Sequence, residues 1–104
     1  MALRLASLSV DLDSLGHYCR IQGLPETLLD DRAKGLVWST AIPRFLELFA
    51  SVGSPATFFV IASDLSDERL APALKTSAAA GVELANHSFS HDYALSRRSR
   101  VEIE

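Results

Sequence analysis

The chain has 104 residues, of which 48% are hydrophobic and 22% charged, a composition typical of one small globular domain. Ten basic residues stand against thirteen acidic ones, and the resulting formal net charge of -3 excludes the long-range positive field that attracts nucleic acid. The single cysteine, Cys19, excludes an internal disulfide and a thiolate-rich metal site, and nothing requires an oxidising compartment.

The first residues of the chain are predicted to form a buried strand. Residues 3–11 are mostly apolar, which suits a strand covered on both faces, as in a parallel α/β sheet. This stretch is short, and Asp11 and Asp13 follow at once, so we do not interpret it as a signal peptide. No apolar run approaches the ~20 residues of a membrane span. We therefore expect a cytoplasmic protein with no membrane partner.

Residues 14–37 are expected to form a long loop excursion with one short helix. Gly16, Gly23, Pro25 and Gly35 interrupt this segment, and no hydrophobic period persists in it. A connection of this length within a compact fold is often functional.

Residues 40–52 are predicted to form a helix. Their apolar side chains recur at offsets of three and four residues: Ile42, Phe45, Leu46, Phe49 and Val52. Pro43 suits a first turn, where its missing N–H has no intrahelical partner, and Gly53 supplies the stop. Residues 56–62, which are rich in aromatic and β-branched side chains, then form a short buried strand.

A second helix is expected after this strand. Asp64 or Ser66 caps it, acidic residues in its first turn favour the positive end of the helix dipole, and Gly81 ends it. Residues 82–86 form a third strand, and residues 96–104 begin a further helix with Ser96 as its cap.

The alternation of strands and helices predicts an α/β fold with a parallel sheet. Strand, helix, strand, helix, strand is the pattern of βαβ units with right-handed crossovers. In such sheets, functional residues gather at the carboxyl ends of the strands. That rule selects Asp11 and Asp13 after the first strand, and residues 86–91 after the third.

His87 and His91 are the candidate metal ligands. They stand four residues apart, so on a helical turn both imidazoles project from one face within reach of a single ion. The spacing alone is weak evidence, but the position beyond a strand end, level with two aspartates, favours a metal site. Two imidazoles and one carboxylate leave coordination positions open, as a catalytic ion requires. The second carboxylate then suits a general base.

Three parts of the chain resemble the polysaccharide deacetylase family, which has the NodB-homology domain. Residues 86–91, Asn-His-Ser-Phe-Ser-His, match the family's His-Ser/Thr-x-x-His motif at every defined position. Residues 9–13, Ser-Val-Asp-Leu-Asp, resemble its Thr-Phe-Asp-Asp-Gly motif. Residues 55–60 and 81–88 look like its second strand and the approach to the histidines. The resemblance extends over nearly the whole chain.

One departure from the family pattern lies in the first motif. The family's two acids are adjacent, whereas Leu12 separates Asp11 from Asp13. This spacing of the two acids resembles that in a divergent branch of the family, which includes allantoinase-like and some peptidoglycan deacetylase relatives. The family's later motifs, an Arg-Pro-containing strand, an Asp-containing segment and a Leu-x-His sequence, do not occur in residues 1–104.

The resemblance implies both a fold and a set of residue roles. Residues 1–104 would be the N-terminal part of the domain, the first half of a distorted (β/α)7 barrel. Asp11 would be the catalytic base, and Asp13, His87 and His91 would hold a divalent metal. Zinc is the expected ion, with cobalt, nickel or iron as alternatives.

The function predicted on these grounds is that of a metal-dependent hydrolase of non-peptide C–N bonds, which deacetylates an N-acetylated carbohydrate with metal-activated water. One alternative keeps the metal and changes the substrate to a small cyclic amide or ureide, as in allantoinase-like enzymes. The other is a non-catalytic metal-binding or assembly fragment, whose exposed sheet edge pairs with a second copy to form a homo-oligomer.

Other conspicuous side chains receive structural interpretations. For His17, in the long loop, an exposed histidine without a role is favoured over a substrate contact. Cys19 is expected to behave as a small hydrophobe, and Trp38 to belong to the core. Ser88 is expected to steady its loop, while Asn86 either orients a ligand or closes a turn.

Overall fold

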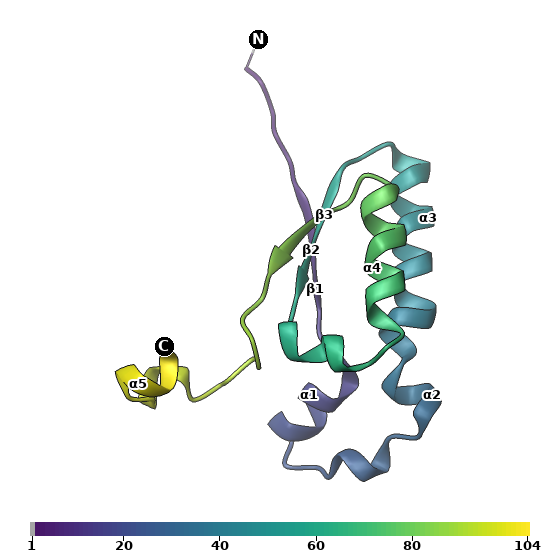
Figure 1. Cartoon of the computed structure of the whole chain (residues 1–104). Coiled ribbons are helices and arrows are strands. Elements are labelled where there is room, and N and C mark those ends of the chain that lie inside the picture. The colour runs from purple at the N-terminus through teal and green to yellow at the C-terminus, as the bar shows by residue number, and fades with distance from the viewer. Residues whose placement is uncertain (1) are drawn as a thin grey trace.

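The computed structural model of the chain describes residues 2–104, which form one parallel sheet of three strands with helices packed on one face (Figure 1). The strands and α-helices in chain order are β1 Leu8–Leu12, α1 Leu15–Ile21, α2 Asp31–Lys34, α3 Ile42–Val52, β2 Ala56–Val60, α4 Leu70–Ala79, β3 Glu83–Asn86 and α5 Arg100–Ile103. The remaining short helical turns are η1 Glu26–Leu28, η2 Val37–Ala41, η3 Ala62–Ser66 and η4 Leu95–Arg97. Within residues 2–104, no helix has the length and apolar character to span a membrane.

The central strand β2 pairs in parallel with both β1 and β3. The register aligns Val10 with Phe58, and Asp11 with Phe59 and Ala85. Because side chains alternate along a strand, Val10 and Phe58 point to the helices while Asp11, Phe59 and Ala85 point to the opposite face. The predicted α/β class with parallel strands is therefore confirmed.

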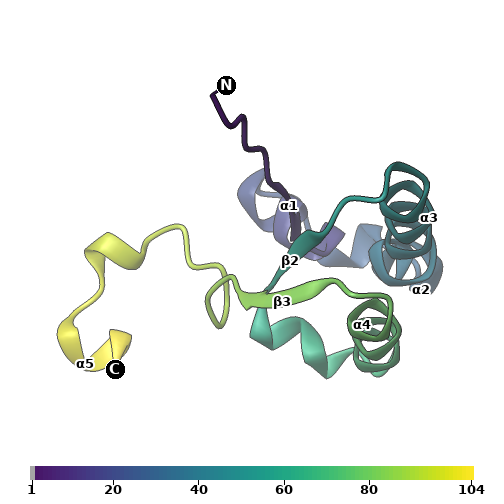
Figure 2. The same ribbon diagram turned by 90° about the horizontal axis from the view of Figure 1, so that it is seen from above.

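The hydrophobic core lies between the sheet and the two longest helices. Figures 1 and 2 show α3 and α4 side by side on the same face of the sheet. Phe58 is fully buried there, and its ring lies 5.9 Å from that of Phe49 on α3. Pro43 is the second residue of α3, which continues directly from the π-turn η2 because Ala41 is already helical, so the predicted helix start is wrong. Gly53 ends the helix as predicted, with a left-handed φ of 62°.

The other face of the sheet carries polar side chains and is open. Ser9, Asp11 and Glu83 are exposed on this face. Among the described residues no helix packs against it, and the segment that leads to α5 runs away from the body on that side (Figure 2). The described strands are consistent with part of a barrel wall, and they do not form a closed barrel.

Several predicted boundaries are wrong. The first strand begins at Leu8, because residues before it have no strand partner. The predicted loop 14–37 contains α1, η1, α2 and the first residue of η2, so more than one short helix forms there. Local capping explains α2: the side chain of Asp30 accepts a hydrogen bond from the backbone N–H of Ala33 at 2.7 Å.

The start of the second helix is also wrong. Asp64 and Ser66 lie in the 3-10 turn η3, and α4 begins only at Leu70. Asp64 does not cap α4, because its carboxylate binds residues near the end of β1 instead. The predicted stop holds, since Gly81 adopts a φ of 90° just beyond α4.

The cap of the last helix differs from the prediction as well. Ser99, and not Ser96, caps α5, which spans Arg100–Ile103. The Ser99 side chain accepts from the N–H of Glu102, whose carboxylate accepts from the N–H of Ser99 in return. This reciprocal pair satisfies two backbone donors, which explains why the helix begins three residues later.

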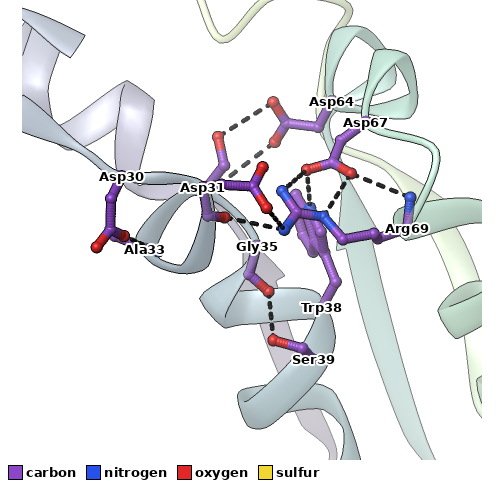
Figure 3. A network of polar contacts seen from close by, with 10 residues as sticks. Asp30, Asp31, Ala33, Gly35, Trp38, Ser39, Asp64, Asp67 and Arg69 are labelled. Carbon is purple, nitrogen blue, oxygen red and sulfur yellow. Dashed lines mark hydrogen bonds and ion pairs between the residues drawn. The ribbon is translucent and has the colours of Figure 1, made fainter. Parts of the chain in front are cut away.

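A network around the Asp67 carboxylate joins α2, η2 and the residues that follow η3 (Figure 3). Asp67 accepts hydrogen bonds from the Trp38 indole at 3.1 Å and from the Arg69 guanidinium at 2.7 and 2.9 Å. Arg69 also donates to the backbone carbonyl of Asp31 at 2.9 Å. A Cβ atom at residue 35 would collide with this guanidinium, so Gly35 is required for the close approach. The hydrogen bonds from Arg69, more than any other contact, lower the pKa of Asp67 from 3.8 to about 2.

This lowered pKa predicts a specific acid sensitivity. The stability that Asp67 contributes is fully present above 3.8 and is lost as the pH falls through about 2. Asp67→Asn should therefore make the free energy of unfolding less dependent on pH across that interval, as measured by urea unfolding at a series of pH values. Arg69→Met, which removes the principal cause of the shift, should flatten the same interval. A wild-type pH slope in both variants would contradict this account.

Candidate metal centre

The pleat of the sheet brings the sequence-predicted residues to one face. Asp11 and Ala85 share a register row through β2, so their side chains point the same way. Asp13 and His87, two residues beyond Asp11 and Ala85, each follow directly after the last residue of their strand. The backbone N–H of His87 donates to the carbonyl of Val60 at 2.9 Å and so prolongs the pairing of β3 by one residue. Asp13 and His87 consequently meet at the carboxyl end of the sheet.

A tight loop, and not a helical turn, returns His91 to the same place. The predicted helical turn is wrong, since Ser88 and His91 have left-handed φ values of 66° and 52°. Asn86 accepts from the N–H of Ser88 at 2.6 Å, and the Ser88 hydroxyl accepts from the N–H of His91 at 2.9 Å. Asn86 thus closes a turn, and Ser88 holds the loop as expected.

The three candidate ligands converge closely. One ligand atom each from Asp13, His87 and His91 lie within 4.8 Å of one another. Nε2 of His87 is 3.5 Å from Oδ1 of Asp13, and Nε2 of His91 is 3.5 Å from Oδ2. These separations are longer than normal hydrogen bonds. They resemble the spacing of two ligands on one tetrahedral ion, about 3.4 Å for bonds of roughly 2.1 Å.

The burial of these groups also fits a cation. The side chain of Asp13 is only 11% exposed, and its Oδ1 atom is buried without a hydrogen-bond partner in the described part of the chain. A buried carboxylate oxygen without a partner is costly. A divalent ion held by this carboxylate and two imidazoles would satisfy it, so the donor set fits the metal that the sequence predicts.

Asp11 occupies a different position from Asp13. Its side chain is 61% exposed, and its Oδ2 atom lies 3.7 Å from Nε2 of His87. The carboxylate therefore stands at the rim of the cluster, open to water and solutes. A group at this position can exchange protons with a molecule held by the cluster.

Aromatic rings surround His91. The His87 and Tyr93 rings lie 4.8 and 4.5 Å from it, both in edge-to-face arrangements. The His17 ring lies 5.6 Å away. Burial and the negative charge of Asp13 raise the pKa of the Tyr93 hydroxyl. The packing restricts the orientation of His91 on three sides.

The sequence did not predict the positions of two residues near the cluster, His17 and Asp64. His17 was expected to be exposed in a loop, but it lies in α1 with 1% of its surface exposed. It hydrogen-bonds Asp64, which the sequence suggested only as a helix cap. Neither has a local sequence signal for this role, because the contact joins segments 47 residues apart.

The comparisons with known proteins agree with the motif at the histidines. A family model described as polysaccharide deacetylase matches residues 28–104, which include His87 and His91 but not Asp11 or Asp13. Among curated proteins and solved structures, none matches the chain significantly.

The geometry predicts that the chain binds one divalent ion. Titration of the purified metal-free chain with Co²⁺, monitored by calorimetry and by visible absorption, should show one binding site. His87→Ala, His91→Ala and Asp13→Asn should each weaken binding by more than about 100-fold, since loss of outer partners alone costs 10- to 100-fold.

Asp11→Asn is the matched control for Asp13→Asn, because both replace a carboxylate by its isosteric amide on the same face of the sheet. Binding should survive in Asp11→Asn. Equal losses in the two variants would contradict the distinction between a ligand at Asp13 and a rim group at Asp11.

Proposed function

The chain belongs to the polysaccharide deacetylase family, and on that premise we propose that it forms the N-terminal part of a metal-dependent hydrolase that removes acetyl groups from an N-acetylated carbohydrate. The observation that carries the proposal is the convergence of Asp13, His87 and His91, with Asp11 open beside them. A carboxylate and two imidazoles leave room on an ion for water and substrate.

Asp13, His87 and His91 hold the metal in this proposal. Zinc is the first candidate, with cobalt, nickel or iron as alternatives that the same ligands accept. When bound, the ion supplies Lewis acidity at the acetyl carbonyl. Outer contacts of this chain restrict the ligands: the Ser88 hydroxyl fixes the backbone of His91, and the Val60 carbonyl fixes that of His87.

Asp11 acts as the general base. Its exposed carboxylate can accept the proton of the attacking water, whose oxygen forms the new bond to the acetyl carbon. The C–N bond then breaks, and the products are acetate and a free amine. The proton for the leaving amine comes from a group that the family resemblance places outside residues 1–104.

The spacing of the two acids supports a second candidate substrate. Leu12 separates Asp11 from Asp13, as in the allantoinase-like branch that the first motif resembles. A small cyclic amide or ureide would be hydrolysed by the same residues, because it presents the same carbonyl and C–N bond.

The test measures turnover by the whole domain that contains this chain. The zinc-loaded protein should release acetate and free amine from N-acetylglucosamine oligomers, and a cyclic ureide serves as the competing substrate. Asp11→Asn should lower kcat by 10²–10⁴-fold, the usual contribution of a general base, while its metal content stays unchanged.

Glu47→Gln is the control, since Glu47 is an exposed carboxylate on α3, which packs on the face of the sheet opposite the candidate ligands. It should retain wild-type kcat. Turnover of the ureide alone would favour the second substrate, and a metal-loaded domain inactive on both would favour a non-catalytic metal-binding role.

A further inference from the structure

The turn η3 contacts both segments that carry the candidate metal ligands. On one side, its backbone N–H groups at Ala62 and Ser63 donate to the carbonyls of Ser88 and Phe89, at 3.1 and 2.7 Å. These two carbonyls belong to the loop between His87 and His91. The turn therefore fixes the path of the histidine loop through main-chain bonds.

On the other side, the carboxylate of Asp64 holds the residues that follow Asp13. Its Oδ1 atom accepts from the Ser14 hydroxyl at 3.2 Å, and its Oδ2 atom faces the Ser14 backbone N–H at 3.4 Å. In Figure 3, two dashed lines end at the carboxylate of Asp64. Ser14 is the next residue after Asp13, so these contacts fix the backbone that carries the ligand.

His17 joins Asp64 to the second ligand segment. The guanidinium of Arg20 contacts its Nδ1 atom, and because a guanidinium only donates, the ring hydrogen must be on Nε2. Nε2 donates to Oδ1 of Asp64 at 2.9 Å. The ring thus held packs 5.6 Å from the ring of His91.

We propose that Asp64 is a positioning residue for the metal centre, which fixes Asp13 through Ser14 and His91 through His17. This rests on the proposed function and goes beyond it. In the described part of the chain, Asp64 hydrogen-bonds none of the three ligands itself. Its carboxylate accepts from donors on one ligand segment and, through an imidazole of fixed tautomer, restricts a ring on the other. Loss of this junction leaves every ligand present but less well oriented.

Asp64→Asn tests this role, because the amide keeps the size of the side chain but replaces one acceptor oxygen by a donor. Co²⁺ affinity of the purified chain should fall 10- to 100-fold, as for other outer partners, with the stoichiometry still at one ion. The visible absorption of the bound Co²⁺ should change in intensity, since the ligand geometry is less constrained. His17→Gln should weaken binding similarly.

The double variant separates positioning from general loss of packing. If Asp64 and His17 act as one unit, the two losses in affinity should be far from additive. Ser14→Ala is a gentler variant that removes only the hydroxyl contact, and it should weaken Co²⁺ binding less than Asp64→Asn while the chain stays folded.

Asp67→Asn is the matched control. Asp67 lies three residues from Asp64, and its carboxylate accepts hydrogen bonds from Trp38 and Arg69. The asparagine variant weakens these bonds, but neither partner lies on a segment that carries a candidate ligand. At neutral pH it should bind Co²⁺ like the wild type. Wild-type affinity in both Asp64→Asn and His17→Gln, or an equal loss in Asp67→Asn, would overturn the inference while the metal site stands. A wild-type chain that binds no Co²⁺ would overturn both proposals.

Discussion

The parallel pairing of β2 with both neighbours is the constraint on which the rest of the structure depends. Phe58 anchors this strand in the core, and the register carries the alternation of β2 across to β1 and β3. Because parallel strands end at the same edge of a sheet, two segments far apart in sequence must deliver their next side chains to one place. The candidate metal centre is a consequence of that register, extended by the bond from His87 to Val60.

Three carboxylates close to this edge differ in how completely their oxygens are paired. Asp67 accepts hydrogen bonds from the Trp38 indole and the Arg69 guanidinium, so both of its oxygens are paired with donors. Asp64 accepts from Ser14 and His17, and joins two segments of the site. Asp13 keeps a buried oxygen that no donor within residues 2–104 reaches. Because Asp67 and Asp64 already have donors, Asp13 is the carboxylate of the three whose free oxygen a bound cation would satisfy.

The sequence predicts the elements better than it predicts their junctions. The strand and helix alternation and the end of α3 at Gly53 follow from local rules that the structure obeys. The meeting of Asp13 with His87 follows from the rule for parallel sheets. The path of the histidine loop does not, because left-handed residues at positions 88 and 91 have no helical or strand period.

The sequence also could not predict the polar contacts of Asp64, because they join segments far apart in the chain. Asp64 looks like a helix cap in sequence, since aspartate before an apolar run commonly caps a helix. Its true partners, Ser14 and His17, lie some fifty residues earlier, and only the sheet register brings them within reach. Neither partner stands in a pattern that identifies it before the strands are paired.

The residue between the two acids explains why this chain can separate them. Leu12 is 1% exposed and points into the core, so it anchors the end of β1 on the helix side. Asp11 in β1 and Asp13, the first residue after β1, then lie on the same side of the sheet, one at the rim and one nearly buried. Two adjacent acids on a continuing strand would point to opposite faces, and one of them would enter the core. The Asp-Leu-Asp spacing therefore keeps both carboxylates beside the histidines while Leu12 stays in the core.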